Sequence, residues 1–142
     1  MTDEAMTIER PALEAVTAWK GHRLDEMTGA NVGRVHGAFV DAESAEPEWL
    51  VARMGRFGHH TLVPARDAVE GVGHIWVPFT REVIRRAPKV DPIASLTANE
   101  ERALLDHYGI GGGAGRAMEL SGREPDTISV RPADQPPDQA AE

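Results

Sequence analysis

Short apolar stretches alternate with turn residues along the central part of the chain, at intervals that are typical of a small all-β domain. Gly33 and Gly37 lie inside one of these stretches, and glycine within a strand indicates a bulge or a sharp bend. A small curled sheet needs such bends, so the pattern predicts a mainly β fold, a barrel or a sandwich. The predicted strands cover residues 22–27, 32–40, 49–54, 60–64 and 74–78.

Two helices are expected after the last of these strands. Residues 80–86 predict a short helix that ends before Pro88. Thr97 and Glu100 match the capping box, in which a hydroxyl and a carboxylate three residues apart satisfy the first backbone N–H groups. This box opens a helix over residues 101–108, and Gly109 stands at the expected C-cap.

The two ends of the chain differ in sequence pattern and composition from its centre. Residues 1–17 read as a flexible N-terminal segment in which Pro11 starts a short helix. Residues 111–142 are rich in glycine, proline and acid, which predicts a disordered tail. Within that tail, residues 127–130 show only a faint strand alternation. The folded domain is therefore expected over residues 18–110.

Composition narrows the class of protein. A chain of 142 residues makes one domain, and 41% hydrophobic with 27% charged residues is ordinary for a soluble one. Only 5% of the residues are aromatic, so we expect an aliphatic core. The absence of cysteine excludes disulfides, thiolate zinc sites and cysteine nucleophiles. No apolar run is long enough to cross a bilayer and the N-terminus has no signal-peptide pattern, so we expect a cytoplasmic protein without membrane insertion.

The charge balance argues against broad attraction to nucleic acid. The chain carries 15 basic and 23 acidic residues, a net charge of −8. Such a chain has no general electrostatic pull toward polyanions, although a local basic patch can still exist.

The sequence offers no convincing catalytic or metal-binding motif. Of the six histidines, only His59 and His60 are close together, and neighbouring strand residues point to opposite faces of a sheet. The acidic loop over residues 41–48 has Glu46 where a calcium loop needs glycine. No serine stands in a nucleophile elbow. We therefore expect no enzyme activity, no catalytic residues, no cofactor and no metal.

One predicted hairpin tip gathers residue types that are common at binding hot spots. Phe57 lies between Gly55 and Gly58, so it is either turned outward for contact or folded back as core. Arginines and histidines flank this ring. The candidate partner-binding residues here are Arg53, Arg56, Phe57, His59 and His60.

A second basic group lies on the first predicted helix. Arg81 and Arg85 are four residues apart and share a helix face. They are either a solvated face paired with acids such as Glu82 or a docking patch for an acidic partner or RNA. Both arginines are kept as candidate partner-binding residues.

A series of short motifs also carries a family resemblance. These motifs occupy residues 19–22, 28–35, 39–41, 47–51, 55–58, 63–64, 76–84 and 87–90. Their order resembles the PRC-barrel domain, and residues 96–110 look like the end of its stand-alone bacterial members. The chain departs from the family in its turns, with Thr28-Gly29 after the first strand and Ala45 where glycine is common.

The resemblance implies a fold and a general role. The family takes its name from the cytoplasmic domain of the photosynthetic reaction-centre H subunit, and a similar domain ends the ribosome maturation factor RimM. It implies a small, mostly antiparallel β-barrel that binds other macromolecules without catalysis. We expect a cytoplasmic adaptor that binds a partner protein or itself, for example as a homodimer. The alternative is an RNA- or ribosome-associated factor of the RimM kind, and a pigment- or metal-linked accessory role ranks last.

Overall fold

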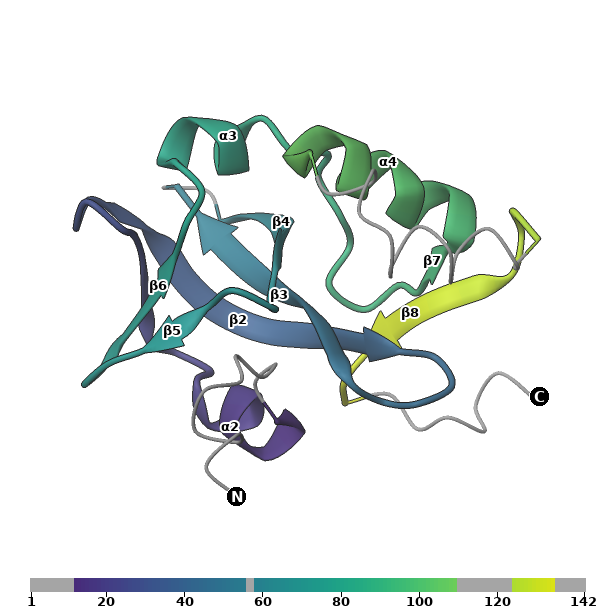
Figure 1. Cartoon of the computed structure of the whole chain (residues 1–142), viewed down its shortest axis with the longest axis horizontal. Coiled ribbons are helices and arrows are strands. Elements are labelled where there is room, and N and C mark those ends of the chain that lie inside the picture. Colours follow the sequence, from purple (N-terminus) through teal and green to yellow (C-terminus); the bar gives the residue numbers. More distant parts are fainter. Residues whose placement is uncertain (1–11, 56–57, 110–123, 135–142) are drawn as a thin grey trace, which may run out of the picture.

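The computed structural model describes residues 12–55, 58–109 and 124–134, and these residues form a mainly β fold with a few short helices (Figure 1). The helices are α2 (Leu13–Ala18), α3 (Arg81–Arg85) and α4 (Ala98–Tyr108). The strands are β1 (Arg23–Glu26), β2 (Asn31–Asp41), β3 (Pro47–Met54), β4 (His59–Pro64), β5 (Val69–Glu70), β6 (His74–Val77), β7 (Leu96–Thr97) and β8 (Ile128–Pro132). All five strands expected from the sequence are confirmed, and so are the three helices.

The strands form one eight-stranded sheet whose main path runs β4-β3-β2-β1-β6-β5. Most neighbours are antiparallel, but β1 and β6 are parallel, so the sheet is mixed. The expected closed antiparallel barrel is corrected to an open sheet, because no pairing within the described residues joins β4 to β5. The outer edge of β4 is met instead by the chain after α3, where Thr61 bridges to Lys89 and the Val90 N–H donates to the His60 carbonyl over 3.0 Å.

Strand β8 lies in the segment that the sequence assigned to a disordered tail. The structure instead pairs it antiparallel with β2, with Asp41 opposite Val130 and Phe39 opposite Pro132. The reason is the length of β2: β1 pairs only with residues 31–34, so the far end of β2 has an open edge. Val130 fills that edge and is fully buried. The predicted tail residues 111–123 and 135–142 lie outside the described residues, as do residues 1–11.

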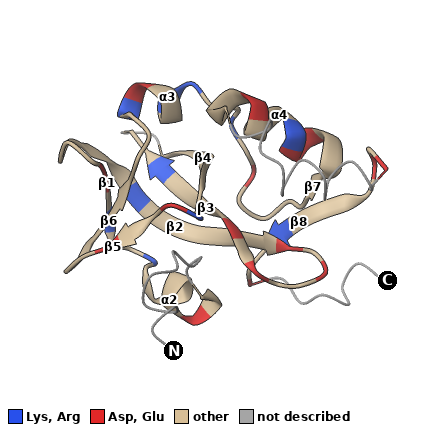
Figure 2. Ribbon diagram, in the orientation of Figure 1, with Lys and Arg blue, Asp and Glu red and all other residues tan. Residues whose placement is uncertain are grey.

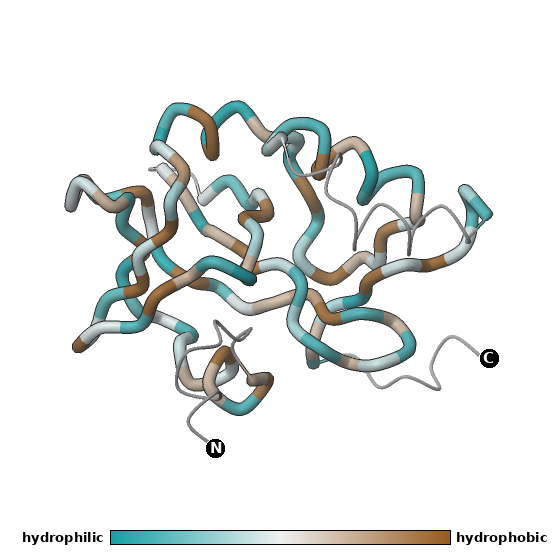
Figure 3. The backbone as a smooth tube through the Cα atoms, viewed as in Figure 1, coloured by the Kyte–Doolittle hydropathy of each residue, from teal (hydrophilic) through white to brown (hydrophobic). Residues whose placement is uncertain are grey.

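The core is mainly aliphatic, as the composition predicts, and hydrophobic segments of the strands are separated by hydrophilic turns (Figure 3). Helix α2 packs on β2 and β3 from one side, and α3 and α4 lie on the other side of this pair in Figure 1. Two polar contacts tie α4 to the sheet. The Trp49 indole Nε1–H donates to Glu101 Oε2 over 2.7 Å, and the Tyr108 hydroxyl donates to the Leu62 carbonyl over 2.6 Å.

Helix α4 begins and ends as the sequence predicts. The Glu100 N–H donates to Thr97 Oγ1 over 3.1 Å and the Thr97 N–H donates to Glu100 Oε1 over 2.9 Å, which completes the capping box. Gly109 closes the helix with φ of 73°, a left-handed conformation that glycine adopts without strain.

None of the helices in the described part of the chain has both the length and the apolar character needed to cross a bilayer.

Candidate interaction surface

The predicted hairpin joins β3 to β4 and brings some of the candidate residues together. Arg53 lies directly opposite His60, and Met54 lies opposite His59. Gly55 and Gly58 have φ of 77° and 69°, positive values that glycine adopts without strain. Arg56 and Phe57 lie outside the described residues, so whether Phe57 turns outward or inward stays a prediction.

Arg53 and His60 belong to a longer row of basic side chains. Along the sheet, Arg53 lies opposite Arg34 of β2, Arg34 opposite Arg23 of β1, and Arg23 beside His74 of β6. Residues directly opposite each other in neighbouring strands project from the same face. We call this row, which crosses five neighbouring strands, the basic belt: His74, Arg23, Arg34, Arg53 and His60. Figure 2 shows Lys or Arg positions in β2 and β3 at this end of the sheet.

The three arginines of the belt are exposed, but their partners differ. Arg23 forms an ion pair with Asp25 over 3.2 Å. Arg34 donates from Nη1 to the backbone carbonyl of Gly21 over 2.8 Å. The guanidinium of Arg53 lies against Gly58, so closely that a Cβ at that glycine would stand 2.7 Å from Nε. Within the described residues, neither Arg34 nor Arg53 has a carboxylate in ion-pair distance.

His60 ends the belt at a partly buried position beside Arg53 and His36. Burial is the main cause that lowers the pKa of His60, and His36 and Arg53 lower it further, whereas Asp91 acts in the opposite direction. The imidazoles of His36 and His60 meet edge to face, with ring centroids 4.6 Å apart. Nε2 of His60 is buried and has no hydrogen-bond partner among the described residues. His60 therefore favours the neutral imidazole in the free protein.

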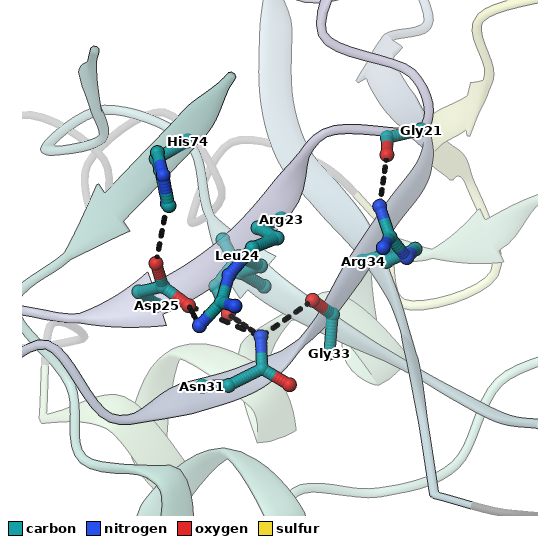
Figure 4. A network of polar contacts seen from close by, with 8 residues as sticks. All are labelled: Gly21, Arg23, Leu24, Asp25, Asn31, Gly33, Arg34 and His74. Carbon is teal, nitrogen blue, oxygen red and sulfur yellow. Dashed lines mark hydrogen bonds and ion pairs between the residues drawn. The ribbon is translucent and has the colours of Figure 1, made fainter. Parts of the chain in front are cut away.

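The other end of the belt is neutralised by a buried carboxylate (Figure 4). Asp25 is 2% exposed and accepts from Arg23 and from Asn31 Nδ2 through Oδ1, the latter over 3.1 Å. Its Oδ2 accepts from His74 Nδ1 over 2.8 Å. Burial acts to raise the pKa of Asp25, but the hydrogen bonds from Asn31, His74 and Arg23 outweigh it, so the pKa lies below its usual value. His74 also stacks on Trp76, with 5.6 Å between ring centroids.

A groove of about 520 Å³ opens beside the belt, between α2, β2, β3, the connection that precedes β7, and the end of β8. Its lining is mostly apolar and includes Val16, Val51 and Ile93. Lys20 and His36 add polar groups to the lining. Because His36 also contacts His60, the groove and the belt form one continuous surface.

The candidate arginines of α3 are arranged differently from the belt. Arg85 pairs with Glu82 over 2.8 Å, and Arg86 pairs with the same carboxylate over 2.9 Å. The hydrogen bond from Arg85 is the main cause that holds the pKa of Glu82 below its usual value. Within the described residues, no hydrogen bond or ion pair links Arg81 or Arg85 to the hairpin. A solvated helix face paired with acids is one of the two interpretations given above for Arg81 and Arg85, and docking of a partner on them stays a prediction.

Sequence reasoning missed three members of the belt: Arg23, Arg34 and His74. A signal was present, because each of the five predicted strands carries one arginine or histidine that falls into the row. Only the register of the strands, however, determines which of these residues become neighbours.

In the described part of the chain, no group of three or more His, Cys, Asp or Glu side chains is placed to hold a metal ion. No model of a known protein family matches the chain, and no curated protein matches it either.

Proposed function

We propose that this chain is a non-catalytic interaction module of the cytoplasm that binds a segment of a partner protein. The observation that carries the proposal is the groove of about 520 Å³ with its largely apolar lining, open at the surface beside the basic belt. Apolar surface rimmed by polar groups is the usual character of a protein interaction site, and arginine is enriched at binding hot spots. The groove fits apolar side chains of a partner, and the belt supplies polar contacts at its rim.

The PRC-barrel resemblance supports the same role. Its members use a small curled β domain to bind other macromolecules, and we propose that this chain is a PRC-type domain with an open sheet. The bends in β2 fit that shape, since its pairing with β3 shifts register between Val35 and Gly37.

A catalytic role has weaker support. The pair that comes nearest to a catalytic arrangement is Asp25 with His74, in which a carboxylate orients an imidazole. The carboxylate also holds Arg23 and Asn31, and no hydroxyl of the described residues hydrogen-bonds to His74. This network is therefore suited to fixing β1 against β6 rather than to activating a nucleophile.

The test is site-specific photo-crosslinking in the native cell. A photoreactive residue replaces Ile93, which is 72% exposed at the groove, and the matched control replaces Val72, which is 96% exposed in the turn before β6. We expect a covalent adduct with one defined protein from position 93 and not from position 72. Adducts from neither position, or the same adducts from both, would contradict the proposal, and an adduct with a second copy of the chain would identify self-association.

The basic belt is the one observation that favours the second candidate, association with RNA or the ribosome. The net charge of −8 opposes it. Co-sedimentation with ribosomes at low salt that is lost on replacing Arg34 and Arg53 would support this candidate over a protein partner.

A further inference from the structure

The basic belt has a charge pattern that the other described residues do not explain. Like charges placed directly opposite each other across a pair of strands destabilise a sheet, yet Arg34 lies opposite Arg53 and next to Arg23. The chain holds 23 acidic residues, and Glu82 neutralises two arginines of α3 at once. In the described residues only Asp25 forms an ion pair with the belt, through Arg23 and His74, and Asp91 acts electrostatically on His60. Within the described residues, the neighbouring guanidiniums of Arg34 and Arg53 have no carboxylate in ion-pair distance.

The geometry of the belt suits carboxylates presented by an extended chain. Neighbouring strands lie about 4.8 Å apart, so the three arginines of the belt, on β1, β2 and β3, present cationic groups at short, regular intervals across the sheet. Alternate side chains of an extended segment lie about 6.8 Å apart on one face, within reach of neighbouring long arginine side chains. Each guanidinium can donate two parallel hydrogen bonds to a carboxylate, which makes the recognition directional.

The surroundings of the belt favour a protein segment over nucleic acid. Binding of single-stranded nucleic acid combines cationic grooves with aromatic rings that stack on bases. The indole nearest the belt, Trp76, already stacks on His74 with 8° between the ring planes. The groove at the His60 end takes apolar side chains, which a peptide has and a phosphate backbone lacks. The overall charge of −8 also opposes a long polyanion more than a short acidic stretch.

We propose that the basic belt binds a short acidic segment of the partner protein, with its carboxylates on Arg34 and Arg53 and its apolar side chains directed to the groove. This inference rests on the proposed function and specifies the chemistry of the partner.

The experiment uses fluorescence anisotropy with the full chain and a fluorescein-labelled hexaglutamate peptide at low salt. We expect saturable binding that weakens as salt is added, since these are exposed charges. A hexaglutamine peptide should not bind. The variant that replaces both belt arginines, Arg34→Gln with Arg53→Gln, should bind hexaglutamate at least ten-fold more weakly. The matched control, Arg85→Gln with Arg86→Gln, removes the same charge from α3 and should stay within two-fold of the unsubstituted protein.

Three results would overturn the proposal. The first is that hexaglutamate does not bind, and the second is that the two double variants lose hexaglutamate affinity equally. The third is that a twelve-nucleotide single-stranded RNA binds more tightly than hexaglutamate and needs the same two arginines, which would assign the belt to nucleic acid. Thermal melting of both variants checks that they are folded. The outcome is separable from the proposed function: an adduct from position 93 together with failed hexaglutamate binding removes the acidic segment and keeps the interaction module. Hexaglutamate binding without an adduct from position 93 would keep the belt as a carboxylate-binding surface and remove the groove as the place where the partner protein binds.

Discussion

Polar groups at the two ends of β3 lie in opposite environments, paired and buried at one end and exposed at the other. Near its start, Trp49 is 1% exposed and its indole N–H donates to Glu101, which is itself fully buried. Four residues later, Arg53 is exposed, faces Arg34 across the sheet and has no carboxylate partner among the described residues. The first arrangement stabilises the fold, because a buried donor meets a buried acceptor. The second is expected to cost stability, because like charges directly opposite each other repel.

A second buried hydrogen bond lies near Trp49, at the end of β3 that α4 covers. Tyr108 of α4 donates to the Leu62 carbonyl, and burial raises the pKa of Tyr108 above its usual value, so the hydroxyl stays protonated and remains a donor. At the belt end, by contrast, Nε2 of His60 is buried without a partner in the described part of the chain. Substitutions should therefore lower stability at the first end and change binding at the second.

The largest effect is expected at Trp49. Trp49→Phe removes the N–H that Glu101 accepts and leaves a smaller ring in a fully buried site, which should lower the free energy of unfolding by about 3 kcal/mol. Urea denaturation measures this value. The matched control is Trp76→Phe, which should cost less than about 1 kcal/mol because Trp76 is only half-buried. Equal losses in the two variants would show that the Trp49–Glu101 contact does not hold this end of the sheet together.

The next largest loss of stability is expected at Val130 and tests whether β8 belongs to the folded sheet. Val130 is fully buried and pairs with Asp41, whereas Ile128 in the same strand is 39% exposed. Val130→Ala should lower the free energy of unfolding by about 2 kcal/mol, from lost apolar burial and the cavity that remains. Ile128→Ala should change it by less than about 0.5 kcal/mol. If both variants melt like the unsubstituted protein, this segment is not part of the folded sheet.

A third prediction concerns Asp25, the buried carboxylate that pairs with Arg23 and His74 of the belt. Since the pKa of Asp25 is lower in the folded protein, its contribution to stability is complete above the unfolded-state value of about 3.9 and is lost as pH falls through the folded-state value. Asp25→Asn should cost about 1.5–3 kcal/mol at pH 7. It should also flatten the loss of stability below about pH 4. Denaturation curves from pH 3 to pH 7 measure both effects, and parallel pH profiles of the two proteins would exclude this role for Asp25.

Local patterns predicted much of this fold. Alternation of apolar residues identified five strands, and the capping box of Thr97 and Glu100 gave the start of α4. Pairings that depend on distant segments could not be predicted. Strand β8 is held by the open edge of β2 rather than by its own weak alternation, and the parallel pairing of β1 with β6 has no local signal.

The candidate surface was predicted only in part, for the same reason. Arg53 and His60 were named from the hairpin, which is a local feature. Arg23, Arg34 and His74 join them only through the register of three strand pairs, and the groove needs α2, β3 and the chain around Ile93 to meet. One local feature noted in the sequence is visible in the structure: Ala45, where the PRC-barrel domains that the chain resembles commonly have glycine, takes φ of 65° in the turn before β3.

The smallest expected change in the free energy of unfolding is at Arg53. It gives the clearest contrast between the two ends of β3, because its sign is opposite to that at Trp49. Arg53→Gln removes one of two like charges that lie directly opposite each other, so it should raise the free energy of unfolding by about 0.5 kcal/mol at low salt. The gain should shrink toward zero at about 1 M salt, where the Debye length is only about 3 Å and exposed charges are screened. The matched control, Arg85→Gln, removes an arginine that has a carboxylate partner and should not stabilise the protein. Urea denaturation at low and high salt measures both variants. A loss of stability in Arg53→Gln at low salt would mean that Arg53 supports the fold, and the contrast with Trp49 would then fail.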